Sequence, residues 1–291
     1  MDNLNIFCFG FGQVAKKFIS KINSKKININ LSVTSREKSN KFFYKDIAYD
    51  NFQFDENTFD QNLIEKLKSS DHILISIAPI KGSEIVIRNF QTVIENSKAK
   101  WITYLSATSV YGDHKSEWVN EESETNPTST NGINRLKAER SWMMLASKRN
   151  LPLQIFRLSG IYSNKKNILA RLKSEEVKII NKDNHFFSRI HLDDIANILF
   201  KSLLKFKRNE IYNISDDKPA SAKDVILYGA KLLKISTPST IAINELENGM
   251  LKNFYKDSKK VDNKKMKSFF SYKLKYPTYI EGLNYIRNNF I

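Results

Sequence analysis

The first 22 residues narrow the choice of folds more than any other part of the chain, because a strand, a glycine turn and a helix follow in direct succession. Residues 4–9 are mostly apolar, as in a buried parallel strand. Apolar side chains then recur at helical spacing from Val14 to Ile22. Between them stands a G-x-G-x-x-A pattern, in which the first glycine allows a tight turn and the second lets the backbone approach a pyrophosphate. We expect a dinucleotide to contact Gly10, Phe11, Gly12, Gln13 and Val14. A tight turn without a ligand is the alternative.

Further apolar runs alternate with helical patterns along the chain. The expected strands are 29–35, 73–77, 101–105, 153–158 and 211–214, and the expected helices are 59–68, 84–96, 135–147, 190–204 and 224–233. Such alternation predicts an α/β fold with a doubly wound parallel sheet. We assign residues 1–160 with 188–214 to a dinucleotide-binding domain, and residues 161–187 with 215–291 to a smaller C-terminal substrate lobe.

The end of the second strand indicates which dinucleotide binds. An NAD site usually places Asp or Glu there, on the ribose 2′-hydroxyl. This chain instead has Ser35 and Arg36, whose hydroxyl and guanidinium suit a 2′-phosphate. We therefore expect NADP in preference to NAD. Two alternatives remain: Glu37 is an NAD-type acid if the strand ends later, and Arg36 is a solvated surface cation.

The formal net charge of the 291 residues is +16, which is characteristic of some nucleic-acid-binding and membrane-binding proteins. The basic residues are 37 Lys and only 10 Arg, however, whereas phosphate-reading surfaces favour the bidentate guanidinium of Arg. The densest basic run is Lys256, Lys259, Lys260, Lys264, Lys265 and Lys267. We interpret the excess as surface composition, and expect neither a nucleic-acid partner nor a membrane partner.

The cellular setting follows from what the sequence lacks. No stretch approaches the roughly 18–20 consecutive apolar residues of a membrane span, and the first residues lack the basic segment of a secretory signal. Cys8 is the only cysteine, so neither an intrachain disulfide nor a cysteine-based zinc site is expected. We expect a cytoplasmic protein without a metal centre.

Several later segments form a recognisable series. They are the S-A-T-S-V-Y-G segment at 106–112, Asn126-Pro127, the R-L-S-G-I-Y segment at 157–162, the R-I-H-L-D-D-I-A segment at 189–196 and Tyr212-Asn213-Ile214. This series resembles the extended short-chain dehydrogenases/reductases, which are the NAD(P)-dependent epimerase/dehydratase family, and covers nearly the whole chain. The glycine turn and the Tyr276-Pro277-Thr278 tail look closer to an atypical branch. The resemblance implies a Rossmann domain and oxidoreductase or epimerase chemistry.

In that family a Ser or Thr, a Tyr and a Lys carry the acid/base chemistry. Counting back from Val110 places the hydroxyl position at Ala107. Counting back from Glu139 places the Lys at Arg135 and the Tyr at Asn131. The resemblance therefore implies an atypical active site in which all three residues are replaced. Arg135 retains a cation that suits the nicotinamide ribose or a phosphate.

Nearby groups are candidates to replace the missing acid and base. Ser106 and Thr108 supply hydroxyls beside Ala107, and Tyr111 is a candidate proton donor. His191 titrates near neutral pH when unperturbed. A structural role at the start of a helix is the alternative for His191.

The resemblance also implies positions for the remaining site residues. Besides the glycine turn, Ser35 and Arg36, the cofactor positions are Ile77, Ala78, Pro79, Leu105, Ser106, Arg135, Leu158 and Ser159. The substrate positions are Tyr111, Trp118, Arg157, Tyr162 and Arg189. A loop-anchoring role is the alternative for Trp118, and buried ion pairing is the alternative for the two arginines. Relatives pair the helices that correspond to 84–96 and 135–147, so a homodimer is expected.

Two functions follow from these expectations. The first is an NADP-dependent oxidoreductase or epimerase-like enzyme that acts on a small polar or sugar-derived molecule with a non-standard acid/base. The second is a dinucleotide-bound sensor or scaffold without catalysis.

Overall fold

A computed structural model of the chain describes residues 3–37, 42–174, 177–245 and 255–291. The chain divides into two compact units. The first comprises Met1–Ala107, Asn134–Arg157 and Ile195–Tyr212, and the second comprises Thr108–Ile133, Leu158–Asp194 and Asn213–Ile291. Within the described ranges, no helix combines the length and apolarity that crossing a membrane requires.

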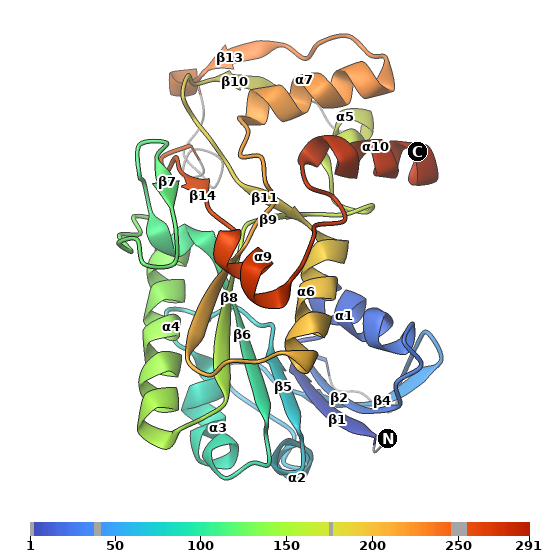
Figure 1. Cartoon of the computed structure of the whole chain (residues 1–291), viewed down its shortest axis with the longest axis vertical. Coiled ribbons are helices and arrows are strands. Elements are labelled where there is room, and N and C mark those ends of the chain that lie inside the picture. Colours follow the sequence, from blue (N-terminus) through green and yellow to red (C-terminus); the bar gives the residue numbers. More distant parts are fainter. Residues whose placement is uncertain (1–2, 38–41, 175–176, 246–254) are drawn as a thin grey trace. The chain divides into compact units, whose positions relative to one another are not determined.

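An eight-stranded sheet organises the first unit (Figure 1). Its strands are β1 (Leu4–Phe9), β2 (Ile29–Ser35), β3 (Phe42–Tyr44), β4 (Ile47–Gln53), β5 (His72–Ile75), β6 (Trp101–Ala107), β8 (Leu153–Leu158) and β12 (Glu210–Ile214). Their order in the sheet is β12-β8-β6-β5-β1-β2-β4-β3. β1 pairs in parallel with β2 and β5, and β3 is antiparallel to β4. The expected α/β fold with a doubly wound, mostly parallel sheet is therefore confirmed.

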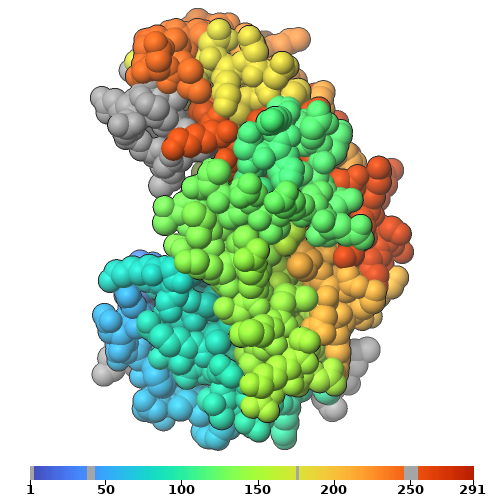
Figure 2. Space-filling view, turned by 90° about the vertical axis from the view of Figure 1, so that its left-hand side faces the viewer, coloured from blue at the N-terminus to red at the C-terminus, as the bar shows by residue number. Residues whose placement is uncertain are grey.

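Helices cover both faces of this sheet because their apolar stripes must be buried. The helices are α1 (Gln13–Asn23), α2 (Leu63–Lys68), α3 (Ile85–Glu95), α4 (Thr130–Arg149) and α6 (Leu192–Leu204). On one face α2, α3 and α4 share a core with the strands, centred on Phe7, Phe9, Phe90 and Trp142. On the other face the rings of Phe18 in α1 and Trp101 stack at 5.9 Å, and the Trp101 indole donates to Ser202 of α6. In Figure 2 the outer sides of α3 and α4 lie at the surface, in teal and green.

The second unit is built from short elements. They are the turn η1 (Thr108–Tyr111), the strands β7 (Trp118–Val119), β9 (Gly160–Tyr162), β10 (Ile179–Asn181), β11 (Arg189–His191), β13 (Thr240–Ala242) and β14 (Lys260–Val261), the turn η2 (Ile243–Glu245), and the helices α5 (Ile168–Ser174), α7 (Ala222–Leu233), α9 (Lys264–Phe270) and α10 (Tyr279–Phe290). The strands pair two by two, β7 with β14, β9 with β11 and β10 with β13. Leu169 of α5, Val225 of α7 and Leu283 of α10 meet in one small core.

The sequence pattern missed several elements. β3 and β4 were not expected, and α2 begins at Leu63, four residues later than expected. α4 begins at Thr130, five residues before the expected start. The two units also differ from the expected domains, since residues 108–133 fall in the second unit. The domain boundaries given above stay a prediction.

Candidate functional site

The glycine turn follows β1, and its geometry requires a glycine at position 10. Gly10 has φ +83°, and a Cβ there would lie 2.6 Å from Cγ2 of Ile77. The backbone N–H of Gly10 donates to Oγ1 of Thr34 at 2.9 Å. The buried hydroxyl of Thr34 at the end of β2 therefore fixes the turn, which lies against Ser76 and Ile77, the two residues that follow β5.

Gly12 differs from Gly10 both in its backbone conformation and in the space around its Cα. It caps α1 in an extended conformation, with φ −80° and ψ −169°, and no side chain caps the helix. A Cβ on Gly12 would meet no atom of the described part of the chain within 4 Å. The first turn of α1 thus presents backbone N–H groups and the positive end of the helix dipole to an open space that admits an anion. This arrangement fits a dinucleotide pyrophosphate.

The sheet order places this turn where an α/β sheet binds ligands. From β1 the chain runs outward through β2 and β4, whereas β5, β6, β8 and β12 extend the sheet in the other direction. The order thus reverses between β1 and β5. Ligands of such sheets bind outside the carboxyl ends of the strands at this reversal. Gly10 follows β1, and Ile77, Ala78 and Pro79 follow β5, so four of the expected cofactor positions lie at the carboxyl ends of the two strands between which the order reverses.

The end of β2 presents a second anchoring region. The hydroxyl of Ser35 donates to the carbonyl of Glu37 at 2.9 Å and accepts from Nδ2 of Asn51 at 2.9 Å. Arg36 is exposed. The pKa of Asp55 is held below its ordinary value, mainly by the backbone N–H groups that its carboxylate accepts and to a smaller extent by the charge of Arg36. A cation thus stands at the position expected to read the 2′-substituent, and the preference for NADP stays a prediction.

The end of β6 brings three expected residues together. Arg135, from α4, donates from Nη1 to the carbonyl of Leu105 at 2.7 Å and to the hydroxyl of Tyr104 at 3.3 Å. Oγ of the buried Ser106 has no hydrogen-bond partner within the described part of the chain. Oγ of Ser159 is likewise buried without a partner there. Buried hydroxyls without partners are uncommon and are typical of sites that complete their hydrogen bonds with a ligand or water.

Glu84 joins this cluster and was not anticipated from the sequence. It caps α3, where Oε1 accepts the backbone N–H of Val86 at 3.1 Å. Burial raises the pKa of Glu84 to about 7, although the backbone N–H of Val86 and the charge of Arg135 favour the charged form. Burial also raises the pKa of Tyr104. The end of β6 therefore holds an acid that titrates near neutral pH beside the guanidinium of Arg135.

In the second unit Thr108 and Tyr111 lie in η1, and both are buried. The hydroxyl of Tyr111 donates to Oδ1 of Asn213 at 2.7 Å. The backbone N–H of Asn213 in turn donates to Oε1 of Glu121 at 2.7 Å. This network ties the turn to β12, so a role for Tyr111 as proton donor requires its hydroxyl to exchange partners.

His191 ends β11 and is buried. Its Nδ1 accepts the backbone N–H of Asp193 at 3.1 Å, which is the helix-start role that the sequence left as the alternative. Its ring packs against Tyr162 at 5.0 Å and Tyr276 at 4.2 Å. These contacts favour a structural role for His191, and its catalytic role stays a prediction.

The remaining substrate candidates occupy different surroundings. Arg157 is buried, and its guanidinium forms a bidentate ion pair with Glu139, with the shortest contact at 2.8 Å, as the alternative interpretation stated. Arg189 donates from Nη1 to the carbonyls of Phe187 and Ala220. Trp118 is 55% exposed. Leu158 ends β8 and is buried.

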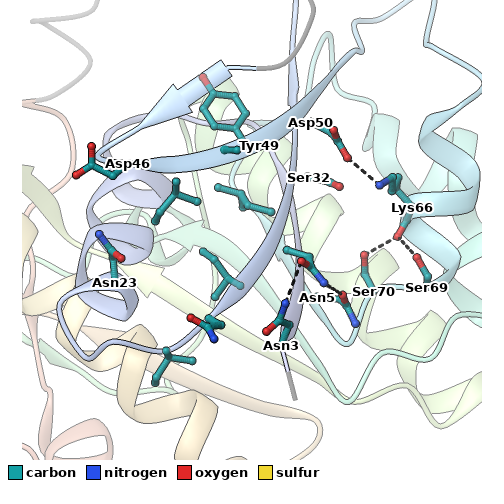
Figure 3. Close-up of a pocket in the computed structure, with 17 residues that line it drawn as sticks. Asn3, Asn5, Asn23, Ser32, Asp46, Tyr49, Asp50, Lys66, Ser69 and Ser70 are labelled. Carbon is teal, nitrogen blue, oxygen red and sulfur yellow. Dashed lines mark hydrogen bonds and ion pairs between the residues drawn. The ribbon is translucent and has the colours of Figure 1, made fainter. Parts of the chain in front are cut away.

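A polar hollow of about 730 Å³ lies at the opposite ends of the strands (Figure 3). Its lining residues precede or begin β1, β2, β4 and β5, and they are mainly amides and hydroxyls. Asp50 and Lys66 of its lining form an ion pair at 2.8 Å. Because open α/β sheets bind cofactors at the carboxyl ends, this hollow is separate from the crevice at Gly10.

No protein-family model and no curated protein matches the chain. Solved structures do match. A conserved protein of unknown function from Silicibacter pomeroyi is 29% identical, with 98% of each chain covered and a TM-score of 0.86. UDP-glucose 4-epimerase from Thermotoga maritima is 16% identical, covering 99% of this chain and 98% of that one, with a TM-score of 0.77. dTDP-glucose 4,6-dehydratase from Bacillus anthracis, solved with NAD, is also 16% identical, covering 98% and 96%, with a TM-score of 0.77.

The chain has the fold of sugar epimerases and dehydratases. That fold confirms the architecture that the resemblance implied. The matches at 16% identity establish the fold alone. The replacement of the catalytic residues at Ala107, Asn131 and Arg135 stays a prediction. Within the described residues, no group of three or more His, Cys, Asp or Glu is placed to hold a metal ion.

Proposed function

We propose that the chain binds a nicotinamide dinucleotide, NADP in preference to NAD, and is an oxidoreductase or epimerase-like enzyme acting on a small polar or sugar-derived molecule. The observation that carries the proposal is the uncapped, open N-terminus of α1 behind Gly12, at the point where the strand order reverses. Structures of the same fold carry NAD, which supports a dinucleotide at this place.

Different residues would bind the pyrophosphate, the 2′-phosphate and the substrate. The turn from Gly10 to Val14 and the first N–H groups of α1 hold the pyrophosphate, and Arg36 neutralises the 2′-phosphate. When bound, the nicotinamide supplies hydride transfer. Arg135 anchors the end of β6 through the carbonyl of Leu105, and the buried hydroxyl of the next residue, Ser106, pairs with a polar group of the ligand. Ser106 and Thr108 supply the hydroxyls that polarise a substrate oxygen.

Gly12→Val separates binding from folding. The valine is compatible with the backbone conformation of Gly12, and its Cβ meets no atom of the described residues within 4 Å, but its side chain fills the space that the phosphates need. We expect NADPH affinity to fall by more than about tenfold, equivalent to about 1.4 kcal/mol, with an unchanged melting temperature. Isothermal titration calorimetry with NADPH measures this, and Ser24→Val at the other end of α1 is the control. Unchanged NADPH binding by Gly12→Val contradicts the proposed site.

Arg36→Gln tests the choice between the two dinucleotides. Loss of the guanidinium should weaken NADPH binding by roughly tenfold and leave NADH binding unchanged, because only NADPH carries the 2′-phosphate. The ratio of the two dissociation constants is the measurement. A ratio that does not change assigns Arg36 to the solvated surface.

A sensor or scaffold without catalysis is the second candidate, favoured by the structural hydrogen bonds of Tyr111 and His191. The triple substitution Ala107→Ser, Asn131→Tyr and Arg135→Lys should then create carbonyl reduction that the parent lacks. NADPH oxidation assayed over a panel of sugar nucleotides and small carbonyl compounds distinguishes the candidates. Turnover by the parent chain excludes the sensor.

A further inference from the structure

The second unit contains a cavity of about 490 Å³ that the proposed dinucleotide site does not use. Its walls come from α5, β10, α7 and α10, together with Phe187 and Tyr255. These elements surround it from several sides, since α7 contacts both α5 and α10. Volumes of roughly 300–1,000 Å³ are usual for pockets that enclose small organic ligands. The cavity therefore has the size of a ligand site within one unit.

The walls of the cavity are largely hydrocarbon. Branched aliphatic side chains form most of them, among them Ile168, Val177, Ile180, Val225, Ile226 and Leu283. Four aromatic rings complete the lining, from Tyr162, Phe187, Tyr255 and Tyr279. Among the described residues the lining includes no Asn, Gln, Ser or Thr, and its hydroxyls are those of three tyrosines. Recognition of a nucleobase or a sugar relies on several amide and hydroxyl partners, so these walls suit a compact, mainly apolar body better.

The charged residues of the described lining are all cations. Arg171 and Lys178 are exposed, and Arg189 is half-buried. Among the residues that the structure describes, no Asp or Glu lines the cavity. An apolar space with three cations in its described lining attracts an anionic group, because a charge pair is worth more where water is scarce.

Arg189 is the cation best placed to hold such an anion. It donates from Nη1 to the carbonyls of Phe187 and Ala220, at 2.8 and 2.9 Å, and its guanidinium lies 5.0 Å from the ring of Phe187. These contacts fix the guanidinium with neutral acceptors. Asp216 attracts the guanidinium electrostatically but makes no ion pair with it in the described structure. Burial lowers the pKa of Arg189, because the charged guanidinium has lost part of its hydration.

We propose that this cavity binds an amphipathic carboxylate, that is, a compact hydrocarbon body with one carboxylate group. The hydrocarbon body packs against the aliphatic and aromatic walls. The carboxylate pairs with Arg189, with Arg171 and Lys178 supplying further positive charge. Tyr162 and Arg189, two of the residues expected to contact substrate, belong to this cavity. The proposal does not rest on dinucleotide binding.

Calorimetric titration of the full chain without any dinucleotide tests the ligand class. The probes are octanoate, 3-phenylpropionate, 1-octanol and UDP. We expect both carboxylates to bind, octanol to bind at least about fivefold more weakly than octanoate, and UDP not to compete. The two carboxylates distinguish an aliphatic from an aromatic body. Failure of both carboxylates to bind at millimolar concentration overturns the proposal, and so does displacement of octanoate by UDP.

Two substitutions locate the ligand. Ala222→Leu places a larger side chain in the cavity and should lower the affinity for octanoate by about tenfold. Lys223→Leu is the matched control, because Lys223 is exposed on the same helix and does not line the cavity. Equal octanoate affinity in the two variants contradicts binding in this cavity.

Charge variants test the anionic end without disturbing the core. Arg171→Gln with Lys178→Glu changes only exposed residues, so folding is preserved even if Ala222→Leu destabilises the chain. The affinity for octanoate should fall by roughly three- to tenfold, while the affinity for octanol stays unchanged. Lys173→Gln on α5 is the control. Equal losses for octanoate and octanol overturn the charge assignment. Because Gly12→Val should leave octanoate binding unaltered, failure here and failure of the dinucleotide site are separable.

Discussion

Two acids of the first unit, the buried Glu139 and the largely buried Glu84, show how local partners decide whether a carboxylate is charged. Glu139 receives a bidentate guanidinium from Arg157, so its charge is compensated inside the core. Glu84 lies near Arg135 without an ion pair between them in the described structure, and burial raises its pKa to about 7. The first acid is therefore a structural ion pair, whereas the second changes charge in the physiological range.

Glu84→Gln should make this titration visible in the stability of the protein. The folded state holds the proton of Glu84 more tightly than the unfolded state, whose pKa is near 4.5. The stability that Glu84 contributes is thus fully present below about pH 4.5 and is lost as the pH rises through about 7. Glutamine keeps the acceptor for the N–H of Val86 but does not titrate.

Urea unfolding of both proteins between pH 4.5 and 8.5 measures the effect. We expect Glu84→Gln to gain roughly 1–2 kcal/mol relative to the parent over this range, allowing for the partial exposure of the side chain. The exposed Glu65→Gln is the control and should show no such trend. A difference between Glu84→Gln and the parent that is constant with pH contradicts the raised pKa.

At the scale of elements, the C-terminal segment depends on one buried carboxylate. Asp194, in the first turn of α6, accepts the hydroxyl of Tyr272 at 2.6 Å and the backbone N–H groups of Lys275 and Tyr276 at 2.7 and 3.1 Å. These bonds set the course of the chain just before α10. The sequence suggested a favourable acid at a helix start, but not this long-range function.

Asp194→Ala should loosen residues 272–276 and α10, because it leaves two backbone donors without acceptors. We expect a loss of about 2–4 kcal/mol and faster hydrogen exchange at Lys275 and Tyr276. Mass spectrometry of peptides from this segment reads the exchange. Asp193→Ala is the matched control, since Asp193 pairs with Lys275 near the surface and should cost less than about 1 kcal/mol. Equal protection in both variants would show that Asp194 does not hold the segment.

Local sequence patterns predicted the buried strands and helices. They did not predict elements that are only partly buried or contacts between residues far apart in the sequence. β1 and β8 are short and largely buried, and both were found within a residue of their bounds. β4 is half-exposed along most of its length, so its sequence lacks the clean alternation that marks a strand. The early start of α4 was missed because Asn131 and Gly132 are weak helix formers.

The candidate site divides in the same way. The glycine turn was predicted because its chemistry lies within six consecutive residues. Glu84 was not, because its neighbours Arg135 and Trp142 come from a helix far along the chain. The cavity of the second unit was equally inaccessible, since its walls are apolar residues that any core would contain.

At the scale of the whole molecule, the net charge of +16 concerns the surface. Exposed lysines pair with acids in several elements, for example Lys66 with Asp50, Lys68 with Glu65 and Lys264 with Asp262. These pairs occur in both units rather than along one element. Such a distribution favours the interpretation that the positive charge reflects the surface composition and not a binding site for nucleic acid.

The last prediction separates a dispersed charge from a nucleic-acid site. We expect Lys264→Glu/Lys265→Glu/Lys267→Glu, in the densest basic run, to weaken binding to a 20-base-pair DNA no more than Lys201→Glu/Lys205→Glu/Lys207→Glu. Both triples change the net charge equally, and a dispersed charge acts mainly through its total. Fluorescence anisotropy from 20 to 200 mM salt gives the affinity and its salt slope. A larger loss and a flatter slope for the first triple alone would mean that those lysines contact phosphates, because each such contact adds about 0.9 to the slope.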